Sequence, residues 1–342
     1  MKDRGQDPDS ARFVVQFDPK EALERYKVDP TQLIEKPRVI LSCRMGSPLA
    51  TIGNCSLLTG KAKSKKTFLL TSIIAAAISG KCSIDCIKGE LPGIGVILID
   101  TEQAPYHLHK TVDRIIRQVG GMIPQNFTAY GLRPLTPSQR VQVIECIVNE
   151  LNRPTLIIVD GLRDLLNKGI NDEMEATSII SKILNWTYEK ECHIMLVLHQ
   201  NKNDVNARGH VGTEAVNKSE TVLSVSVDSN DREVSIVTAE YCRDIDFPSF
   251  CFSIGEDGLP HEVEGSEAGQ STVIKDMTET FTQILTGKRP MHYAELVALY
   301  QEFSGKGSST AKKHIALALR KKILQKESSG AYHLYKDFGG GG

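Results

Sequence analysis

A lysine-rich loop between an apolar run and a helical pattern is the segment best suited to chemistry. It matches the phosphate-loop pattern Gly-x-x-x-x-Gly-Lys-Ser/Thr at Gly60, Lys66 and Thr67, but Lys65 replaces the second glycine. In such loops, backbone N–H groups surround phosphate, the lysine binds the outer phosphates and the hydroxyl binds Mg²⁺. We therefore predict Thr67 as a Mg²⁺ ligand. The predicted nucleotide-binding residues are Gly60, Lys61, Ala62, Lys63, Ser64, Lys65, Lys66, Thr67 and Phe68.

A basic surface loop before an ordinary core helix is the alternative interpretation. Lys65 favours it, because a side chain with a Cβ fits that position only where the backbone conformation allows one. The apolar run before the loop and the helical apolar spacing over residues 68–78 favour a phosphate loop.

Polar side chains also follow three other apolar runs, where ligands of open α/β sheets bind. Asp160 ends one run and is a candidate Mg²⁺ ligand. Glu102 follows a second run and could polarise an attacking water, although it could also cap the next helix. His199 and Gln200 end the third and could contact a γ-phosphate. Apolar runs ending in Asp are common, and a single histidine is more often structural, so these assignments depend on the loop upstream.

The composition is that of a globular protein in a reducing compartment. The chain has 342 residues, 40% hydrophobic and 24% charged, with a net charge of −1. Among eight cysteines, Cys82 and Cys86 are four residues apart, but no second close pair completes a zinc site. A polar beginning and the absence of apolar runs of about 18 residues predict a cytoplasmic protein without a membrane span.

Strand and helix patterns alternate through most of the chain and predict an α/β fold, a doubly wound and mainly parallel sheet. The expected strands cover residues 55–59, 95–100, 155–160, 193–199 and 221–227. The expected helices cover residues 67–78, 104–119, 137–151 and 173–191. Two later runs, residues 233–241 and 249–254, predict an antiparallel extension.

Composition divides the chain into five parts: a tail with a short helix (1–37), the α/β domain (38–264), a polar linker (265–271), a small C-terminal domain (272–338) and a disordered tail (339–342). The small domain has helical patterns over 273–285, 293–303 and 310–321. A hairpin signal at 328–330 follows. Three helices and a hairpin are the layout of a winged helix-turn-helix.

These residues resemble the RecA-like ATPases, particularly the hexameric helicases that include plasmid RepA. They are also similar to AAA-family ATPases of bacterial mobilisable elements. Those proteins have a K-S-[KR]-K-T loop, and residues 63–67 of this chain match it. The resemblance covers residues 38–255.

The resemblance implies a role for each candidate. Lys66 and Thr67 would bind ATP and Mg²⁺, Glu102 would be the catalytic glutamate, and Asp160 the Mg²⁺-binding acid. His199 and Gln200 would form the sensor motif.

The resemblance also implies DNA-facing loops near residues 207–213, with Arg208 and Lys218 as candidate DNA contacts, and a trans-acting arginine finger at Arg243. The usual Lys-x-Arg pair here is Tyr-Cys-Arg. The alternative for Arg243 is a surface ion pair with Asp244 or Asp246.

The C-terminal region is basic. Residues 287–326 contain nine Lys/Arg and two acids, a local net charge of +7. Such a stretch predicts salt-sensitive DNA binding, whereas the alternative is a winged helix that contacts protein. The candidate DNA contacts are Lys312, Lys313, Arg320, Lys321 and Lys322.

The sequence thus predicts an ATP-hydrolysing RecA-like motor or DNA-remodelling ATPase, possessing helicase activity, in replication or mobilisation of a mobile genetic element. Its expected partners are single- or double-stranded DNA and further copies of itself, as in a hexamer. The alternative is a nucleotide-gated DNA-binding regulator without motor activity.

Overall fold

The computed structural model describes residues 17–335, apart from residues 82–83, 201–208, 246, 264–267, 288, 306, 321 and 328, and apart from the side chains at 45, 268–276, 309, 313 and 320. The chain divides into two compact units, Met1–Pro37 and Arg38–Gly342.

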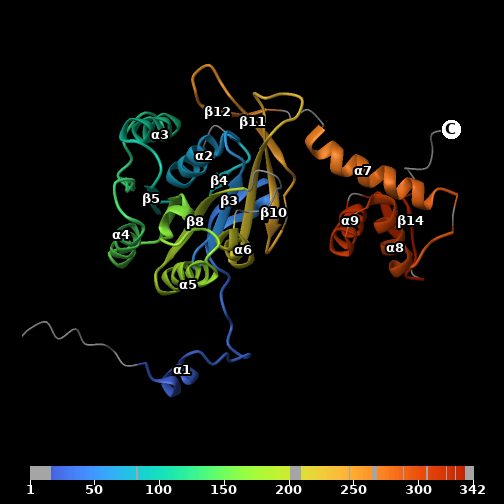
Figure 1. Cartoon of the computed structure of the whole chain (residues 1–342), viewed down its shortest axis with the longest axis horizontal. Helices are drawn as coiled ribbons and strands as arrows, with labels where there is room; N and C mark the ends of the chain where they lie inside the picture. The colour runs from blue at the N-terminus through green and yellow to red at the C-terminus, as the bar shows by residue number, and fades with distance from the viewer. Residues whose placement is uncertain are drawn as a thin grey trace, which may run out of the picture. The chain divides into compact units, whose positions relative to one another are not determined.

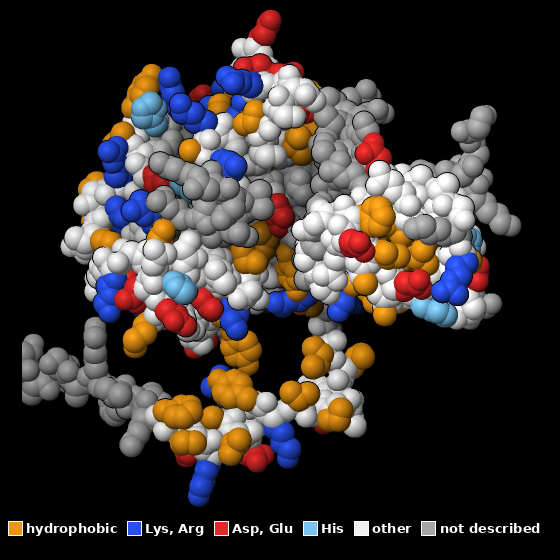
Figure 2. Space-filling view, turned by 45° about the vertical axis from the view of Figure 1, so that its right-hand side comes forward, with side chains coloured by type: hydrophobic (Ala, Val, Ile, Leu, Met, Phe, Trp, Pro, Cys, Tyr) orange, Lys and Arg blue, Asp and Glu red, His pale blue; other side chains and the backbone are white. Residues whose placement is uncertain are grey.

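The first unit contains helix α1 (Pro19–Arg25), whose first turn is capped by the Asp18 carboxylate. Apolar side chains stand on the surface of this unit (Figure 2). They are Phe17, Leu23, Tyr26, Val28, Leu33 and Ile34.

A nine-stranded sheet forms the centre of the second unit, with the strand order β12-β11-β10-β9-β3-β8-β7-β5-β6. Six strands are parallel: β3 (Cys55–Gly60), β5 (Gly95–Asp100), β6 (Phe127–Gly131), β7 (Thr155–Asp160), β8 (Cys192–His199) and β9 (Thr221–Val227). The remaining three are antiparallel: β10 (Ser235–Cys242), β11 (Phe250–Ile254) and β12 (Pro260–Val263).

Helices cover both faces of this sheet (Figure 1). On one face lie α2 (Lys66–Ser79) and α3 (Pro105–Gln118), and on the other α4 (Pro137–Asn149), α5 (Glu173–Glu189) and α6 (Gly209–Lys218). Successive strand residues alternate between two apolar cores, as Leu57 and Leu58 illustrate. Burial on both faces explains the continuous apolar runs of the sequence.

A three-stranded sheet, β2-β1-β4, packs beside the first core. Its strands are β1 (Val39–Cys43), β2 (Ser47–Thr51) and β4 (Lys88–Gly89). Ile40 and Leu41 of β1 are fully buried in that core, so this small sheet covers part of α2.

The C-terminal region has its own apolar core, whose described members lie between residues 277 and 334. Its elements are α7 (Ala268–Leu285), α8 (Tyr293–Ser304), α9 (Ser308–Arg320), β13 (Leu324–Lys326) and β14 (Tyr332–Leu334). The rings of Phe281 and Tyr300 lie 4.7 Å apart at its centre, and the Tyr300 hydroxyl lies 2.6 Å from His314 Nδ1. Three helices and a hairpin therefore occur in the predicted order. A separate winged-helix domain remains a prediction.

The predicted α/β fold with a mainly parallel sheet is confirmed. The sequence interpretation missed β6, α6, β12 and the three-stranded sheet. It also began the first antiparallel run at residue 233, two residues before the start of β10. Within the described residues, no helix has the length and apolarity that crossing a membrane requires.

Candidate active site

The loop between β3 and α2 has the shape of a phosphate cradle. Lys63 and Lys65 both have left-handed backbone conformations, with φ of 65° and 63°. A Cβ added at Gly60 would lie 2.4 Å from the Val225 carbonyl oxygen, so only glycine fits there. Left-handed residues in a tight loop can direct successive backbone N–H groups into one concave space, which suits an anion.

The start of α2 leaves polar groups available to this cradle. No side chain among the described residues caps the helix. The buried Ser64 hydroxyl also has no hydrogen-bond partner within the described part of the chain. An uncapped helix N-terminus and a buried orphan hydroxyl fit a bound phosphate.

Lys66 lies at the centre of the site and is largely buried. Its Nζ donates to the carbonyl oxygens of Gly60 at 2.8 Å and Lys61 at 2.9 Å, and it lies 3.1 Å from His199 Nδ1. Burial lowers the pKa of Lys66 to about 8, although the charges of Asp160 and Glu102 oppose the shift.

Two carboxylates act on Lys66, those of Glu102 and Asp160, and a third, Asp100, lies beside them at the ends of β5 and β7. Asp100 and Asp160 are register partners on these neighbouring strands, and Glu102 follows β5 by two residues. Burial, together with the charges of Asp100 and Glu102, raises the pKa of Asp160 to about 7. The His199 ring, whose Nε2 lies 3.7 Å from Glu102 Oε2, keeps the pKa of Glu102 below its usual value. Glu102 is therefore ionised at neutral pH.

The loop that carries Glu102 is fixed by two side chains that the sequence interpretation missed. The Asp100 carboxylate accepts from the backbone N–H groups of Glu102 at 3.0 Å and Gln103 at 2.7 Å. The Thr101 hydroxyl accepts from the Gly161 N–H at 2.9 Å and lies 3.0 Å from Asp164 Oδ2. Thr101 thus joins the ends of β5 and β7. The sequence does contain a signal for these contacts, the order Asp-Thr-Glu-Gln at the end of a strand. An Asp in that position can accept hydrogen bonds from the backbone N–H groups that follow it.

Most of the predicted nucleotide-site residues, although not Gly60, surround one cavity of about 210 Å³. It is lined by Lys63, Ser64, Lys65, Lys66, Thr67, Phe68, Glu102, Gln103, Asp160, Val197 and His199. Gln200 adjoins it, because its backbone N–H donates to the Gly60 carbonyl at 3.1 Å. The cavity combines an ammonium group, a threonine hydroxyl and two carboxylates, a set that fits a magnesium nucleotide.

Some predicted binding residues lie outside the cavity. The exposed Lys61 and Ala62 do not line it. Lys65 lines the cavity, although its ammonium group donates to carbonyl oxygens of the turn between β9 and β10, and its part in nucleotide binding stays a prediction.

Arg243 lies at the opposite end of the sheet from the phosphate loop. It follows Cys242, which pairs with Thr221, and Thr221 pairs with Ser56 near the start of β3. Gly60 ends β3, four residues and about 13 Å further along that strand. Arg243 is exposed, and within the described residues no ion pair joins it to Asp244. Asp246 lies outside the described residues.

The candidate DNA contacts are only partly described. Lys218, Lys312 and Lys322 are exposed. Arg208 and Lys321 lie outside the described residues, as do the side chains of Lys313 and Arg320. The segment that follows Arg208 forms α6.

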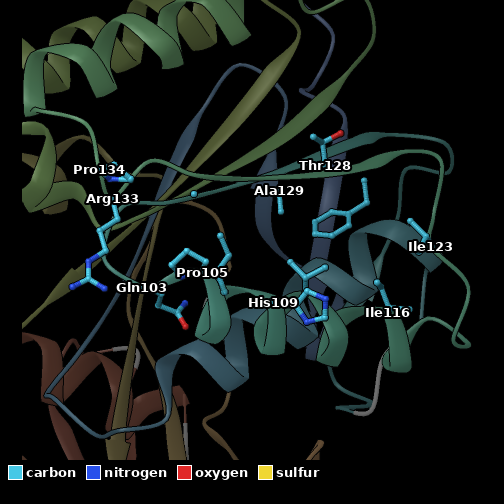
Figure 3. A pocket seen from close by; sticks show the side chains of 13 residues that line it. Gln103, Pro105, His109, Ile116, Ile123, Thr128, Ala129, Arg133 and Pro134 are labelled. Carbon is cyan, nitrogen blue, oxygen red and sulfur yellow. The ribbon is translucent and has the colours of Figure 1, made fainter.

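A second cavity, of about 630 Å³, lies between α3 and the edge strand β6 (Figure 3). Its lining is mainly apolar, with His109 and Arg133 among the polar exceptions. Gln103 borders both cavities.

One family model matches the part of the chain that contains this site. Residues 46–205 match the family model described as AAA domain. No curated protein matches the chain.

Two solved structures are similar to it. The ATPase domain of the protein G-40-P is 11% identical, with a TM-score of 0.45, over 62% of this chain and 85% of that chain. The RadB recombinase is 15% identical, with a TM-score of 0.45, over 64% of this chain and 94% of that chain. The matched residues 46–205 include the phosphate loop, Glu102 and Asp160, which line the smaller cavity.

Proposed function

We propose that this chain hydrolyses ATP as a RecA-like motor or DNA-remodelling ATPase, in replication or mobilisation of a mobile genetic element. The observation that carries the hydrolytic part is that an ionised Glu102 lines the same cavity as Lys66 and Asp160. A base and a phosphate-binding lysine in one cavity are what attack by water on a bound phosphate requires.

In this mechanism Glu102 accepts a proton from water while the water oxygen forms a bond to the γ-phosphorus. The bond from that phosphorus to the bridging oxygen breaks, and ADP carries the electron pair away. The Lys66 ammonium stabilises the charge on the phosphate oxygens, and His199 and Gln200 sense the γ-phosphate from the end of β8. Asp100 and Thr101 hold the Glu102 backbone in place.

Thr67 and Asp160 would hold Mg²⁺. The ion supplies positive charge to the phosphate oxygens when bound. The raised pKa of Asp160 supports this assignment, because a divalent cation would stabilise the ionised form that burial disfavours.

The placement of Arg243 supports sites shared between subunits. An arginine at the opposite end of the sheet cannot reach the phosphate loop of its own chain, but it could serve a neighbouring copy as an arginine finger. We therefore propose a homo-oligomer, such as a hexamer. DNA would contact residues near Arg208 and Lys218 and the basic C-terminal region.

The second candidate function is a nucleotide-gated DNA-binding regulator without motor activity. The side chain of Lys65, which ties the phosphate loop to another part of the sheet, favours it, since such a loop can report nucleotide binding without turnover.

Steady-state ATP turnover by the full chain, with and without DNA, separates the two candidates. We expect turnover that DNA increases, its loss in folded K66A, and nucleotide binding without hydrolysis in E102Q. Normal turnover in E102Q would reduce Glu102 to a loop acid. Nucleotide binding by the wild type without any turnover would favour the regulator.

A further inference from the structure

Lys65 is the residue at which the phosphate loop departs from its pattern, and its side chain has a defined position. Its Nζ donates to the carbonyl oxygen of Glu233 at 2.6 Å and to that of Arg232 at 3.3 Å, and lies 3.6 Å from Glu233 Oε2. Only 18% of the side chain is exposed. A glycine at this position could make none of these bonds.

The acceptors belong to the turn between β9 and β10, which has hydrogen bonds of its own. The Asp228 N–H donates to the Val234 carbonyl at 3.0 Å, and the Asp231 carboxylate accepts from the Glu233 N–H at 2.8 Å. Next along the chain, the Ser235 hydroxyl donates to the Ser64 carbonyl at 3.4 Å. The loop and the turn therefore meet at two adjacent points.

Strand β10 connects this turn to the opposite end of the sheet. Ser235 begins the strand beside the loop, and Cys242 ends it immediately before Arg243. β10 pairs with β9 from Ser235 to Cys242, so the turn is the part of this hairpin that lies at the phosphate loop.

We propose that Lys65 is a positioning residue, which fastens the phosphate loop to the β9–β10 turn and transmits nucleotide binding to that turn. The proposal rests on the nucleotide binding proposed above. It explains a lysine in a left-handed conformation, which glycine would adopt more easily, because the side chain makes bonds that glycine cannot.

Lys63 provides a matched control. It has nearly the same backbone conformation, with φ of 65°, but it is exposed, and no described residue bonds its ammonium group. Replacing either lysine with glycine removes the same backbone strain, whereas only K65G removes the tie to the turn.

The experiment is amide hydrogen exchange on the full-length protein without nucleotide, in wild type, K65G, K65M, K65R and K63G, each first shown to be folded by circular dichroism. We expect exchange in residues 229–234 to be about tenfold faster in K65G and K65M, as loss of a hydrogen bond from a charged donor produces. K65R, which retains the charge, and K63G should behave like wild type in this segment.

A second arm adds Mg²⁺ and a non-hydrolysable ATP analogue. In wild type, we expect slower exchange both in the loop, residues 60–67, and in residues 229–234. In K65M, only the loop should slow. The analogue's affinity should fall in K65G, whereas relief of backbone strain alone would raise it.

Two results would overturn the proposal. If exchange in residues 229–234 is the same in K65G, K63G and wild type, the Lys65 side chain does not stabilise the β9–β10 turn. Protection of that segment by the analogue in K65M would show that the signal takes another route. If the analogue does not slow exchange in the loop of the wild type, nucleotide binding and its transmission to the turn are both contradicted. The comparison without nucleotide would still show whether Lys65 holds the turn.

Discussion

Lys66 and Asp160 share one cavity but have opposite pH requirements. Lys66, with a pKa of about 8, binds phosphate best when protonated, so its contribution falls as the pH rises through 8. Asp160, with a pKa of about 7, binds a cation only when ionised, so its contribution falls as the pH drops through 7. In the proposed site without ligand, protonated Lys66 and ionised Asp160 therefore coexist best between these two pKa values.

The first prediction at this scale concerns Asp160. Between pH 7 and pH 6, Mg²⁺-dependent nucleotide affinity should fall up to about tenfold in wild type, because a proton competes with the cation at Asp160. D160N should bind Mg²⁺ more weakly and lose this pH dependence. Mg²⁺ titrations of a fluorescent ATP analogue measure both. An equally steep dependence in D160N would assign it to another group.

The site residues with a strand-end signal could be predicted from the sequence. Glu102, Asp160 and His199 follow apolar runs, and parallel strands bring such positions to one edge. Asp100 and Thr101 were missed because their roles depend on contacts with backbone groups that only folding brings together. The direction of the Lys65 side chain depends on a turn about 165 residues further along the chain, which no local pattern specifies.

At the scale of the elements, β8 carries a second polar cluster at the end of the sheet opposite the phosphate loop. His193 is fully buried, with Nε2 2.8 Å from Ser56 Oγ and Nδ1 2.9 Å from the Thr51 carbonyl. Burial lowers the pKa of His193 to about 4. Burial raises the pKa of the adjacent Glu220, whose carboxylate accepts from Thr51.

This cluster predicts acid sensitivity. The unfolded chain protonates His193 near pH 6.5 and the folded chain near pH 4, so stability is lost as the pH falls through this interval. Between pH 7.5 and pH 5 the unfolding free energy should fall by about 2 kcal/mol from this group. Glu220 acts in the opposite direction. Urea unfolding at both values should show a smaller decrease in H193Q, and an unchanged decrease would contradict the assignment.

Strand β10 supports a prediction about subunit sharing. R243A alone should lower turnover by about a thousandfold or more, as loss of an arginine finger does. Mixing R243A with K66A subunits should restore part of the turnover, because an intact loop of one can meet Arg243 of the other. Turnover assays on mixtures, with the native mass of the assembly, test this. A monomer at working concentrations would contradict it.

Elements differ in how visible they are in the sequence. Buried parallel strands such as β7 are continuous apolar runs, so they were predicted almost to the residue. β6 lies at the edge of the sheet, and its Phe-Thr-Ala-Tyr-Gly sequence is only half-buried, so it lacks such a run. β4 contains two residues and is defined only by its pairing with β1.

At the scale of the whole molecule, the C-terminal region has the internal core that an independent domain needs. The ring pair of Phe281 and Tyr300 lies within that core, and among the described side chains its members begin at Met277. The basic residues predicted to contact DNA belong to the same region.

We predict that a fragment of residues 272–338 folds and binds duplex DNA. Each phosphate it neutralises contributes about −0.9 to the slope of log affinity against log salt concentration. Replacing Lys312 and Lys313 with alanine should reduce that slope by about 1–2. Fluorescence anisotropy over a salt series measures it. A folded fragment without DNA binding at low salt would instead indicate a protein-contacting surface.

The hydrogen bonds of Lys66 have a consequence for ligand choice. Its three ammonium protons face three acceptors within the chain: the carbonyls of Gly60 and Lys61, and the His199 ring. A ligand oxygen can therefore reach Nζ only by displacing an internal partner, so binding is an exchange and not a simple addition. A nucleoside or monophosphate that stops short of Lys66 leaves those bonds intact and gains nothing from the lysine. Discrimination between short and long phosphate chains is thus a property of the resting hydrogen-bond pattern, before any catalytic group acts.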